Sequence, residues 1–316
     1  MTSIDRLWRR LVAPFLAALA FLLVATPATA APCTQNCFTP GDHIVATLYK
    51  GLLRTYIVHV PASYTGASDV PLVIDFHGGA NSALGERQYS GQLQQSDKRG
   101  FIVVYPEGVA TTWNAYGCCL ASNMLALDDV GFARTVIAQV KSRAAIDNDR
   151  VFATGISNGG GMAQRMACEA ADVIRAAVSV SFPMNTDNCR PARPVQIAEI
   201  AGSNDTNIPY NGSNGPVVPV IGNLIGFAAV ESARSSFVKW HVINRCSDDM
   251  AREQLPNGSQ MEEYLGCADG VRTALVTIQG GRHILYNGYV DPLSGYDGNN
   301  APIDVADYIW THFFNI

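Results

Sequence analysis

The stretch Arg150-Val-Phe-Ala-Thr-Gly155-Ile-Ser157-Asn-Gly159-Gly-Gly-Met162 joins a strand-forming run to a helix-forming run, with a serine at the junction. β-Branched and aromatic residues precede the serine, and a run of good helix formers follows the glycines. A turn this tight has no room for side chains two residues before and two residues after its apex, which explains Gly155 and Gly159. The pattern predicts that Ser157 is an exposed nucleophile, and an ordinary glycine-rich loop is the alternative.

The first thirty residues have the features of a secretory signal peptide. Three arginines precede the apolar run 11–25, and an Ala-Thr-Ala cleavage pattern ends at Ala30. The apolar run is too short for a transmembrane helix. We therefore predict a signal peptide at residues 1–30 and a single catalytic domain at residues 31–316. The mature protein is expected outside the cell or in the periplasm, with no membrane partner.

The charge of the chain limits its possible partners. It has 22 basic and 27 acidic residues, which gives a formal net charge of −5 at pH 7. A mildly acidic surface argues against nucleic acid or an anionic membrane as a partner. The length suits one large domain that can bury a sizeable core.

All eight cysteines follow the predicted signal peptide, and an even number in an exported chain favours disulfides. We predict two local pairs, and two pairs that join neighbouring cysteines in the middle of the chain to later ones. These are Cys33–Cys37, Cys246–Cys267, and Cys118 and Cys119 with Cys168 and Cys189. Because no C-x-x-C spacing occurs, we expect no structural zinc and no cofactor.

Strand and helix patterns alternate along the chain, which predicts a mainly parallel sheet with helices on both faces. Strands are expected at residues 43–49, 54–60, 71–76, 101–105, 151–154, 176–181, 195–201 and 273–279. Helices are expected at residues 82–98, 128–145, 162–168, 231–242 and 303–314. The polar segment around Asp248, Asp249 and Asp269 is predicted to be a disulfide-closed loop. Residues 208–227 are predicted to be irregular, either over the active site or as a plain surface loop.

A nucleophilic serine needs a base that takes its proton and an acid that orients the base. In a strand–turn–helix site of this kind the acid and then the histidine follow the serine along the chain. Asp205 comes just after the strand at 195–201, whereas its main rival, Asp187, precedes that strand. His283 follows the last expected strand through two glycines. We predict Ser157, Asp205 and His283 as the catalytic residues.

His77-Gly78-Gly79 follows an early strand, too early in the chain for the catalytic base. In this arrangement the backbone N–H groups after that strand point at the nucleophile. We predict that the N–H groups of Gly79 and Asn158 form an oxyanion hole. The alternative is that the glycines simply make a turn.

Two aromatic residues, Trp113 and Tyr116, lie in a loop before the helix that begins near Asp128. An aromatic acyl group or a sugar could stack on them, so both are predicted to contact the substrate. Packing within the core or the loop is the alternative.

Five motifs occur in a fixed order along the chain. They are Phe76-His-Gly-Gly79, Asp128-Asp-Val-Gly-Phe132, Gly155-Ile-Ser-Asn-Gly-Gly160, Gly202-Ser-Asn-Asp-Thr-Asn-Ile-Pro-Tyr210 and Gly280-Gly-Arg-His283. Together they resemble the exported polyhydroxybutyrate-depolymerase-like esterases, which are close to the feruloyl and acetylxylan esterases of carbohydrate esterase family 1. The resemblance covers roughly residues 40 to 315. It implies an α/β-hydrolase fold and metal-free ester hydrolysis by Ser157, Asp205 and His283.

The chain departs from the family pattern at two places. Leu285-Tyr286 follows the base where the family often has Trp-Pro, and Ala201-Gly202-Ser203 precedes the acid where it often has His-Gly-Thr. Both departures are expected to reshape the pocket without removing a catalytic group.

The substrate is narrowed less than the chemistry. Relatives that degrade the insoluble polyester usually carry a linker and a polymer-binding domain, and little sequence follows the last expected helix here. We therefore expect feruloyl or acetyl-type esters of plant polysaccharide, or similarly accessible esters. The alternatives are poly(3-hydroxybutyrate) or its oligomers, acyl transfer to a sugar acceptor, and a catalytically silent binding protein.

Overall fold

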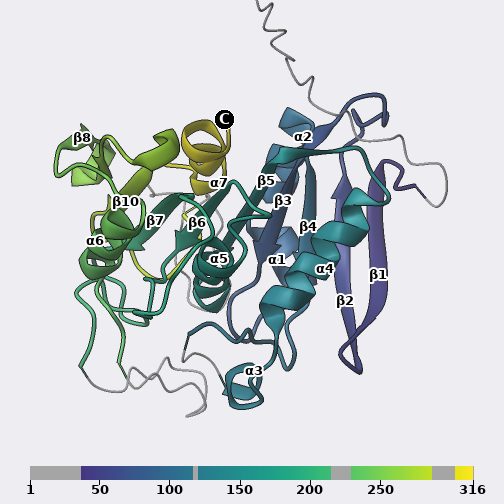
Figure 1. Ribbon diagram of the computed structural model, residues 1–316, viewed down its shortest axis with the longest axis horizontal. Coiled ribbons are helices and arrows are strands. Elements are labelled where there is room, and N and C mark those ends of the chain that lie inside the picture. Colours follow the sequence, from purple (N-terminus) through teal and green to yellow (C-terminus); the bar gives the residue numbers. More distant parts are fainter. Residues whose placement is uncertain (1–36, 117–119, 215–228, 287–302, 316) are drawn as a thin grey trace, which may run out of the picture.

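The computed structural model describes residues 37–116, 120–214, 229–286 and 303–315 (Figure 1). The predicted signal peptide lies outside the described residues, as do Cys33, Cys118, Cys119 and most of the irregular segment 208–227. Within the described ranges, no helix is both long and apolar enough to span a membrane.

One sheet contains every strand of the described residues, in the order β1-β2-β4-β3-β5-β6-β7-β10-β9-β8. The strands are β1 Gly41–Tyr49, β2 Leu52–Val60, β3 Val70–Phe76, β4 Ile102–Pro106, β5 Ile146–Ile156, β6 Ala176–Val180, β7 Gln196–Gly202, β8 Met250–Gln254, β9 Gln260–Tyr264 and β10 Thr273–Ile278. The helices are α1 Ala83–Tyr89, α2 Gln92–Arg99, α3 Leu120–Met124, α4 Asp129–Lys141, α5 Asn158–Glu169, α6 Ala233–Ile243 and α7 Val305–Ile309.

The centre of the sheet is parallel, as the sequence predicts. Neighbouring strands run parallel from β4 through β3, β5, β6 and β7 to β10. Antiparallel strands flank this block, with β1 and β2 at one side and β9 and β8 at the other. Every residue of β4 and β6 is buried, because helices cover both faces of the sheet.

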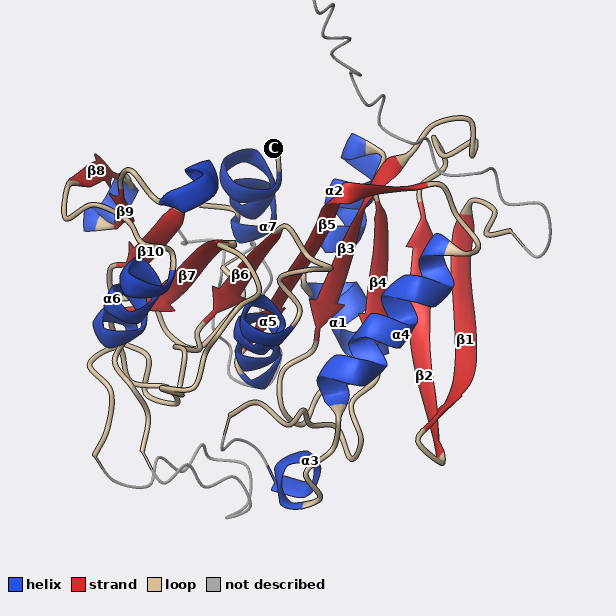
Figure 2. Cartoon of the chain, in the orientation of Figure 1, coloured by secondary structure: helices blue, strands red, loops and turns tan. Residues whose placement is uncertain are grey.

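Figures 1 and 2 show α4, α5 and α6 on one face of the sheet and α1, α2 and α7 on the other. The side chains of β3 alternate between two cores. Ile74 packs with the core under α4, α5 and α6, which includes Met162 and Trp240. Val73 packs with the core under α7, which includes Trp310. This two-sided burial holds the strand ends in fixed relative positions.

Two predicted elements need correction. The helix expected at 82–98 is two helices, because Gly91 between them has a φ of 79°. The segment expected to be a disulfide-closed polar loop contains the hairpin of β8 and β9. Arg252 on β8 pairs with Glu262 on β9, so cross-strand charge pairing replaces the apolar alternation that usually identifies a strand.

The disulfide prediction is partly wrong. Cys246 pairs with Cys267 as predicted. Cys168 pairs with Cys189, so neither of these two can bind Cys118 or Cys119. The fold brings the last turn of α5 next to the segment after β6, so this pair spans 21 residues, as Cys246–Cys267 does. Cys37 is also disulfide-bonded, and its predicted partner Cys33 lies outside the described residues.

The sheet contains a buried glutamate, Glu199. Glu199 on β7 is buried, and burial raises the pKa of its carboxyl to about 8, while the hydroxyl of Ser236 opposes the rise. The folded pKa is therefore above the ordinary value of 4.5. A proton bound by the folded state stabilises it fully below that ordinary value, and this contribution is lost as the pH rises through about 8.

Replacement of Glu199 by glutamine should remove this part of the pH dependence. Urea unfolding at pH 5 and pH 8.5 measures the free energy of unfolding of both proteins. The wild-type protein should lose more stability between these two values than the variant, by up to about 4 kcal/mol. Other buried acids contribute equally to both proteins, and Glu253→Gln at an exposed position serves as the control. An identical loss in both proteins would disprove the assignment.

Candidate active site

Ser157 lies at the turn from β5 to α5, with φ of 55° and ψ of −125°. This left-handed conformation is strained for a residue with a side chain. A Cβ atom on Gly159 would lie 2.0 Å from the carbonyl oxygen of Phe76, and one on Gly155 would lie 2.5 Å from it. Because backbone blocks both positions, only glycine fits. The tight turn expected from the sequence is therefore present, with the serine at its apex.

The other predicted site residues gather at one edge of the sheet. Gly79 follows β3, Ser157 follows β5, Asp205 follows β7 and His283 follows β10. These strands are parallel, so their carboxyl ends share an edge, as the arrowheads of β3, β6 and β7 show in Figure 2. We call this the carboxyl edge. It collects four segments that are far apart in the sequence.

Asp205 and His283 form a hydrogen bond at this edge. Nδ1 of His283 lies 2.7 Å from Oδ2 of Asp205, and the two side chains are 15% and 2% exposed. The other carboxylate oxygen accepts the backbone N–H groups of Asn207 and Ile208, each at 2.8 Å. A carboxylate only accepts, so Nδ1 carries the hydrogen. Nε2 of His283 is therefore the basic nitrogen, which is the arrangement that a general base requires.

The rival acid is excluded from this position. The side chain of Asp187 is 87% exposed and pairs with Lys239 at 2.7 Å. The loops that hold the acid and the base are instead bonded to each other. The N–H of Asn204 donates to the carbonyl of Gly281 at 2.9 Å, and the N–H of Gly280 donates to Oγ of Ser203 at 2.8 Å.

Tyr286 stands at the first departure from the family pattern and packs against the segment that contains the second. Its buried ring packs so closely that a Cβ atom on Gly202 would lie 2.2 Å from its hydroxyl oxygen. That hydroxyl donates to the carbonyl of Arg282, next to the base. Its carbonyl accepts the N–H of Val305 at 2.9 Å, at the start of α7. Tyr286 thus fixes the base loop to the end of the acid strand and to a helix.

The predicted stacking of Trp113 on a substrate is wrong. Its side chain is 0% exposed, and its indole N–H donates to the carbonyl of His77 at 3.0 Å. The side chain of Asn158 holds the Trp113 backbone at both ends: Oδ1 accepts its N–H at 2.6 Å and Nδ2 donates to its carbonyl at 3.0 Å. Trp113 therefore connects the two segments expected to form the oxyanion hole.

Tyr116 is the second aromatic residue that was predicted to contact the substrate. It is half-buried, and the guanidinium carbon of Arg165 lies 5.7 Å from its ring centre. The predicted contact between its ring and the substrate stays a prediction.

His77 is a buried structural residue. Its Nδ1 donates to the carbonyl of Gly78 at 2.7 Å, and its Nε2 accepts the N–H of Gly108 at 2.9 Å. Burial lowers the pKa of His77 to about 4, so the ring is neutral near pH 7. A neutral ring is what both hydrogen bonds require, because a protonated Nε2 could not accept from Gly108.

Two buried acids, Asp75 and Glu86, lie close to the segment that contains His77 and Gly78. Burial raises the pKa of Asp75 on β3 to about 7, and it also raises the pKa of Glu86 on α1. The charge of Asp75 raises the pKa of Glu86 further, while a hydrogen bond from the backbone of Gly78 lowers it. Glu86 therefore helps to hold the backbone of Gly78 in place.

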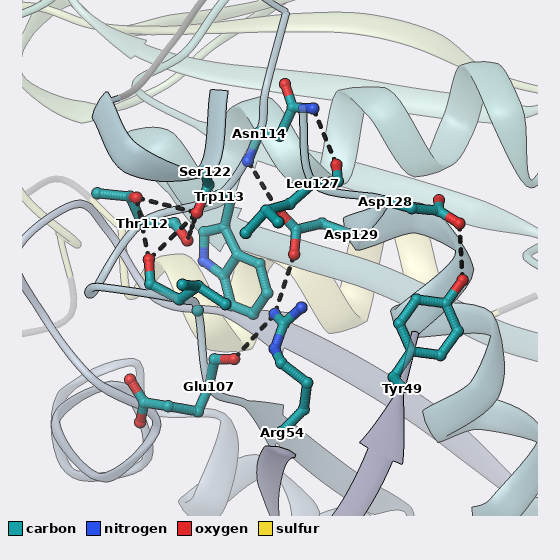
Figure 3. Close-up of polar contacts among 12 residues, drawn as sticks. Tyr49, Arg54, Glu107, Thr112, Trp113, Asn114, Ser122, Leu127, Asp128 and Asp129 are labelled. Atoms are coloured by element: carbon teal, nitrogen blue, oxygen red, sulfur yellow. Dashed lines mark hydrogen bonds and ion pairs between the residues drawn. The ribbon is translucent and has the colours of Figure 1, made fainter. Parts of the chain in front are cut away.

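A buried ion pair fixes the loop that contains Trp113 (Figure 3). Arg54 on β2 and Asp129 on α4 are 2.9 Å apart, with side chains 3% and 0% exposed. Asp129 also accepts the N–H of Asn114 at 2.8 Å, and Arg54 donates to the carbonyl of Glu107 at 3.1 Å. The pair thus holds both ends of residues 107–114. Sequence reasoning missed it, although an arginine in the mostly apolar stretch 52–60 is a visible signal.

The chain is similar in sequence to known esterases. Residues 54–186 match the family model described as Esterase PHB depolymerase. The chain is 34% identical over 239 residues to feruloyl esterase B of Piromyces equi, which covers 73% of this chain and 42% of that protein. It is 27% identical over 284 residues to feruloyl esterase D of Neurospora crassa, covering 84% and 87% of the two chains. The chain thus spans less than half the length of the Piromyces protein.

Comparison of structures shows the fold. The acetyl xylan esterase from Aspergillus awamori superimposes with a TM-score of 0.55 and 14% identity, covering 77% of this chain and 94% of that one. The predicted α/β-hydrolase fold is confirmed by this likeness and by the strand order.

Proposed function

Because the chain resembles the Esterase PHB depolymerase family over residues 54–186, we propose that it is a serine carboxylesterase. The observation that carries the proposal is the hydrogen bond between His283 and Asp205 at the edge where Ser157 stands on its strained turn. An acid-oriented base at the same sheet edge as a serine on a tight turn fits the constellation that acyl transfer requires.

In the proposed reaction, Oγ of Ser157 attacks the ester carbonyl carbon. Nε2 of His283 takes the serine proton and then gives it to the leaving alcohol as the acyl-enzyme forms. Water, activated by the same nitrogen, attacks the acyl group, and the carboxylic acid leaves. Asp205 stays ionised, holds the ring through Nδ1 and stabilises its positive charge.

The negative charge on the carbonyl oxygen is held by the backbone N–H groups of Gly79 and Asn158. Loss of one such donor typically costs about 3–4 kcal/mol of transition-state stabilisation. Preorganisation of these donors is therefore important, and Trp113 supports it. Its indole bonds the segment before Gly79, and its backbone bonds the side chain of Asn158.

The proposed substrates are feruloyl or acetyl-type esters of plant polysaccharide. Support comes from the relatives, which bear the names feruloyl esterase B and feruloyl esterase D. Export to the cell exterior or periplasm is proposed from the signal-like residues 1–30, and the two disulfides of the described part suit an oxidising compartment.

Methyl ferulate and a 3-hydroxybutyrate trimer, offered side by side to the purified protein, test this assignment. We expect free ferulate by mass spectrometry and an intact trimer. Trimer cleavage with untouched methyl ferulate would instead support polyester oligomers as substrates. A sugar added as acceptor tests the transferase alternative, because transfer would yield an acylated sugar in place of free acid. No release from any of these esters would contradict the proposal.

A further inference from the structure

A cavity lies along α6. It has a volume of about 560 Å³ and is bounded by α6 and by the segment from Met184 to Arg190. A neighbouring cavity of about 450 Å³ shares Cys189, Arg190 and Ile243 with it. We call the two together the α6 cavity. Its size is typical of small-molecule sites.

One part of the α6 cavity is apolar. Met184, Cys189 and Ile243 line this part. Val238 and Val242 line it from α6, and they are 43% and 67% exposed. When a ligand covers large apolar side chains that line a cavity and still face solvent, their burial makes the free energy of binding more favourable.

The other part is positively charged. Arg190, Arg193 and Arg245 line the smaller cavity. In the part of the chain that the structure describes, no carboxylate forms an ion pair with any of the three. Arg190 donates only to the carbonyls of Asp187 and Cys189, at 3.1 and 2.8 Å. The hydrogen bond from Arg134 is the main cause that lowers the pKa of Asp172, and the charge of Arg193 adds to it.

The remaining charges of the cavity are already neutralised. Lys239 pairs with Asp187 at 2.7 Å and with Glu231 at 3.0 Å. Arg234 pairs with Glu262 on β9. Arg190 is thus the charged group of the larger cavity that is left to bind an anion, and it stands where the apolar and basic parts meet.

The basic part of the α6 cavity lies at the end of α6 that is remote from the carboxyl edge. The first residue of α6, Ala233, donates to the carbonyl of Tyr210, which follows the catalytic acid. At the other end, Asn244 bonds both backbone groups of Val195, just before β7. The 11 residues of α6 separate these ends by about 16 Å. The basic part of the α6 cavity is therefore separate from the site around Ser157, whereas Ser232 and Arg234 line the larger cavity at the opposite end of α6.

The walls of the cavity are held in place before any ligand arrives. The disulfide Cys168–Cys189 ties the wall to α5. The N–H of Met184 donates to Oγ of Ser236 on α6 at 2.9 Å. Pro191 and Pro194 restrict the backbone next to Arg190. A preformed wall lowers the entropic cost of binding.

We propose that the α6 cavity binds an amphipathic carboxylate, a hydrophobic or aromatic acid whose carboxylate meets Arg190. A neutral apolar ligand would leave the arginines without an anion, and a small inorganic anion would leave the valines uncovered. An acid with an apolar body satisfies both parts. The acid that the proposed hydrolysis releases belongs to this class, and this link alone rests on the proposed function.

The test uses ferulate, methyl ferulate and 3-hydroxybutyrate as probes. Their binding to Ser157→Ala protein, which cannot turn the ester over, is measured by calorimetry at low ionic strength. Ferulate should bind at least tenfold more tightly than methyl ferulate, which lacks the charge, and than 3-hydroxybutyrate, which lacks the apolar body. Adding Arg190→Gln or Val242→Asp should weaken ferulate binding at least tenfold. Arg150→Gln, at an arginine that pairs with Asp147 on β5, is the matched control and should change nothing.

Two results would overturn the proposal: ferulate affinity unchanged by both cavity variants, or no ferulate binding at all. Circular dichroism and urea unfolding confirm that each variant is folded. Arg190→Gln in the otherwise native protein should keep its hydrolysis rate for 4-nitrophenyl acetate. A native protein without esterase activity would contradict the proposed function only, because the binding experiment does not depend on turnover.

Discussion

Replacement of Ser157 by alanine should lower kcat for a short-chain ester by about 10⁶-fold, while the protein stays folded. The substitution removes the only atom that is proposed to bond to the substrate. Removal of Oγ disturbs little else, because the serine backbone provides the structural bonds of the turn. Its N–H donates to Val180 at 2.8 Å, and its carbonyl accepts from Gly161 at 2.9 Å. Release of 4-nitrophenol from 4-nitrophenyl acetate measures the rate, and circular dichroism measures the fold.

The controls separate the nucleophile from serines in general. Ser142→Ala, at the end of α4, should leave kcat unchanged. His283→Ala should cost about as much as Ser157→Ala, and the double variant should cost no more than either one, because groups that act as a unit are not additive. Activity near the wild-type level in Ser157→Ala would rule out the whole catalytic scheme.

The positions of the proposed catalytic residues at one sheet edge could be predicted because each has a local signature. Gly155 and Gly159 are required by backbone atoms of Phe76, a steric demand that appears directly as a sequence pattern. Asp205 and His283 each follow a strand of apolar residues, and parallel strands bring such positions to one edge. Strand identity and chain order were therefore enough to bring the acid and the base together.

The environment of Trp113 could not be predicted in the same way. From the sequence, an aromatic residue in a loop suits a substrate as well as a core. Its burial depends on Asn158 and His77, which lie 45 and 36 residues away in the chain. The prediction that Cys168 and Cys189 bind Cys118 and Cys119 was wrong. The observed Cys168–Cys189 pair depends on where the segment after β6 runs.

Arg54 and Asp129 show what the sequence reveals only in part. Of the adjacent Asp128 and Asp129, only Asp128 caps α4, by accepting the N–H of Gly131 at 2.9 Å. Asp129 points into the protein and meets an arginine 75 residues earlier. Two adjacent aspartates thus have opposite surroundings, because a helix turns successive side chains about 100° apart. The motif Asp-Asp-Val-Gly-Phe combines a cap with a buried anchor.

Replacement of Asp129 by alanine should lower the free energy of unfolding by about 3–5 kcal/mol. The variant leaves the guanidinium of Arg54 buried without its counter-charge, against the ring of Phe132 at 3.9 Å from its centre. It also leaves the N–H of Asn114 without its acceptor. Urea unfolding at pH 7 measures the loss. Because the ion pair holds residues 107–114, kcat should fall as well, with little change in KM for a small ester.

The surface provides the contrast for this prediction. Lys50 and Asp128 also form an ion pair, at 2.6 Å, but their side chains are 65% and 37% exposed. Lys50→Ala should therefore cost less than about 1 kcal/mol. The double variant Arg54→Met with Asp129→Leu should recover much of the stability lost in Asp129→Ala, because it removes both buried charges together. If Asp129→Ala is as stable as Lys50→Ala, the buried pair does not anchor the loop, and Trp113 must be held by its bonds to Asn158 and His77 alone.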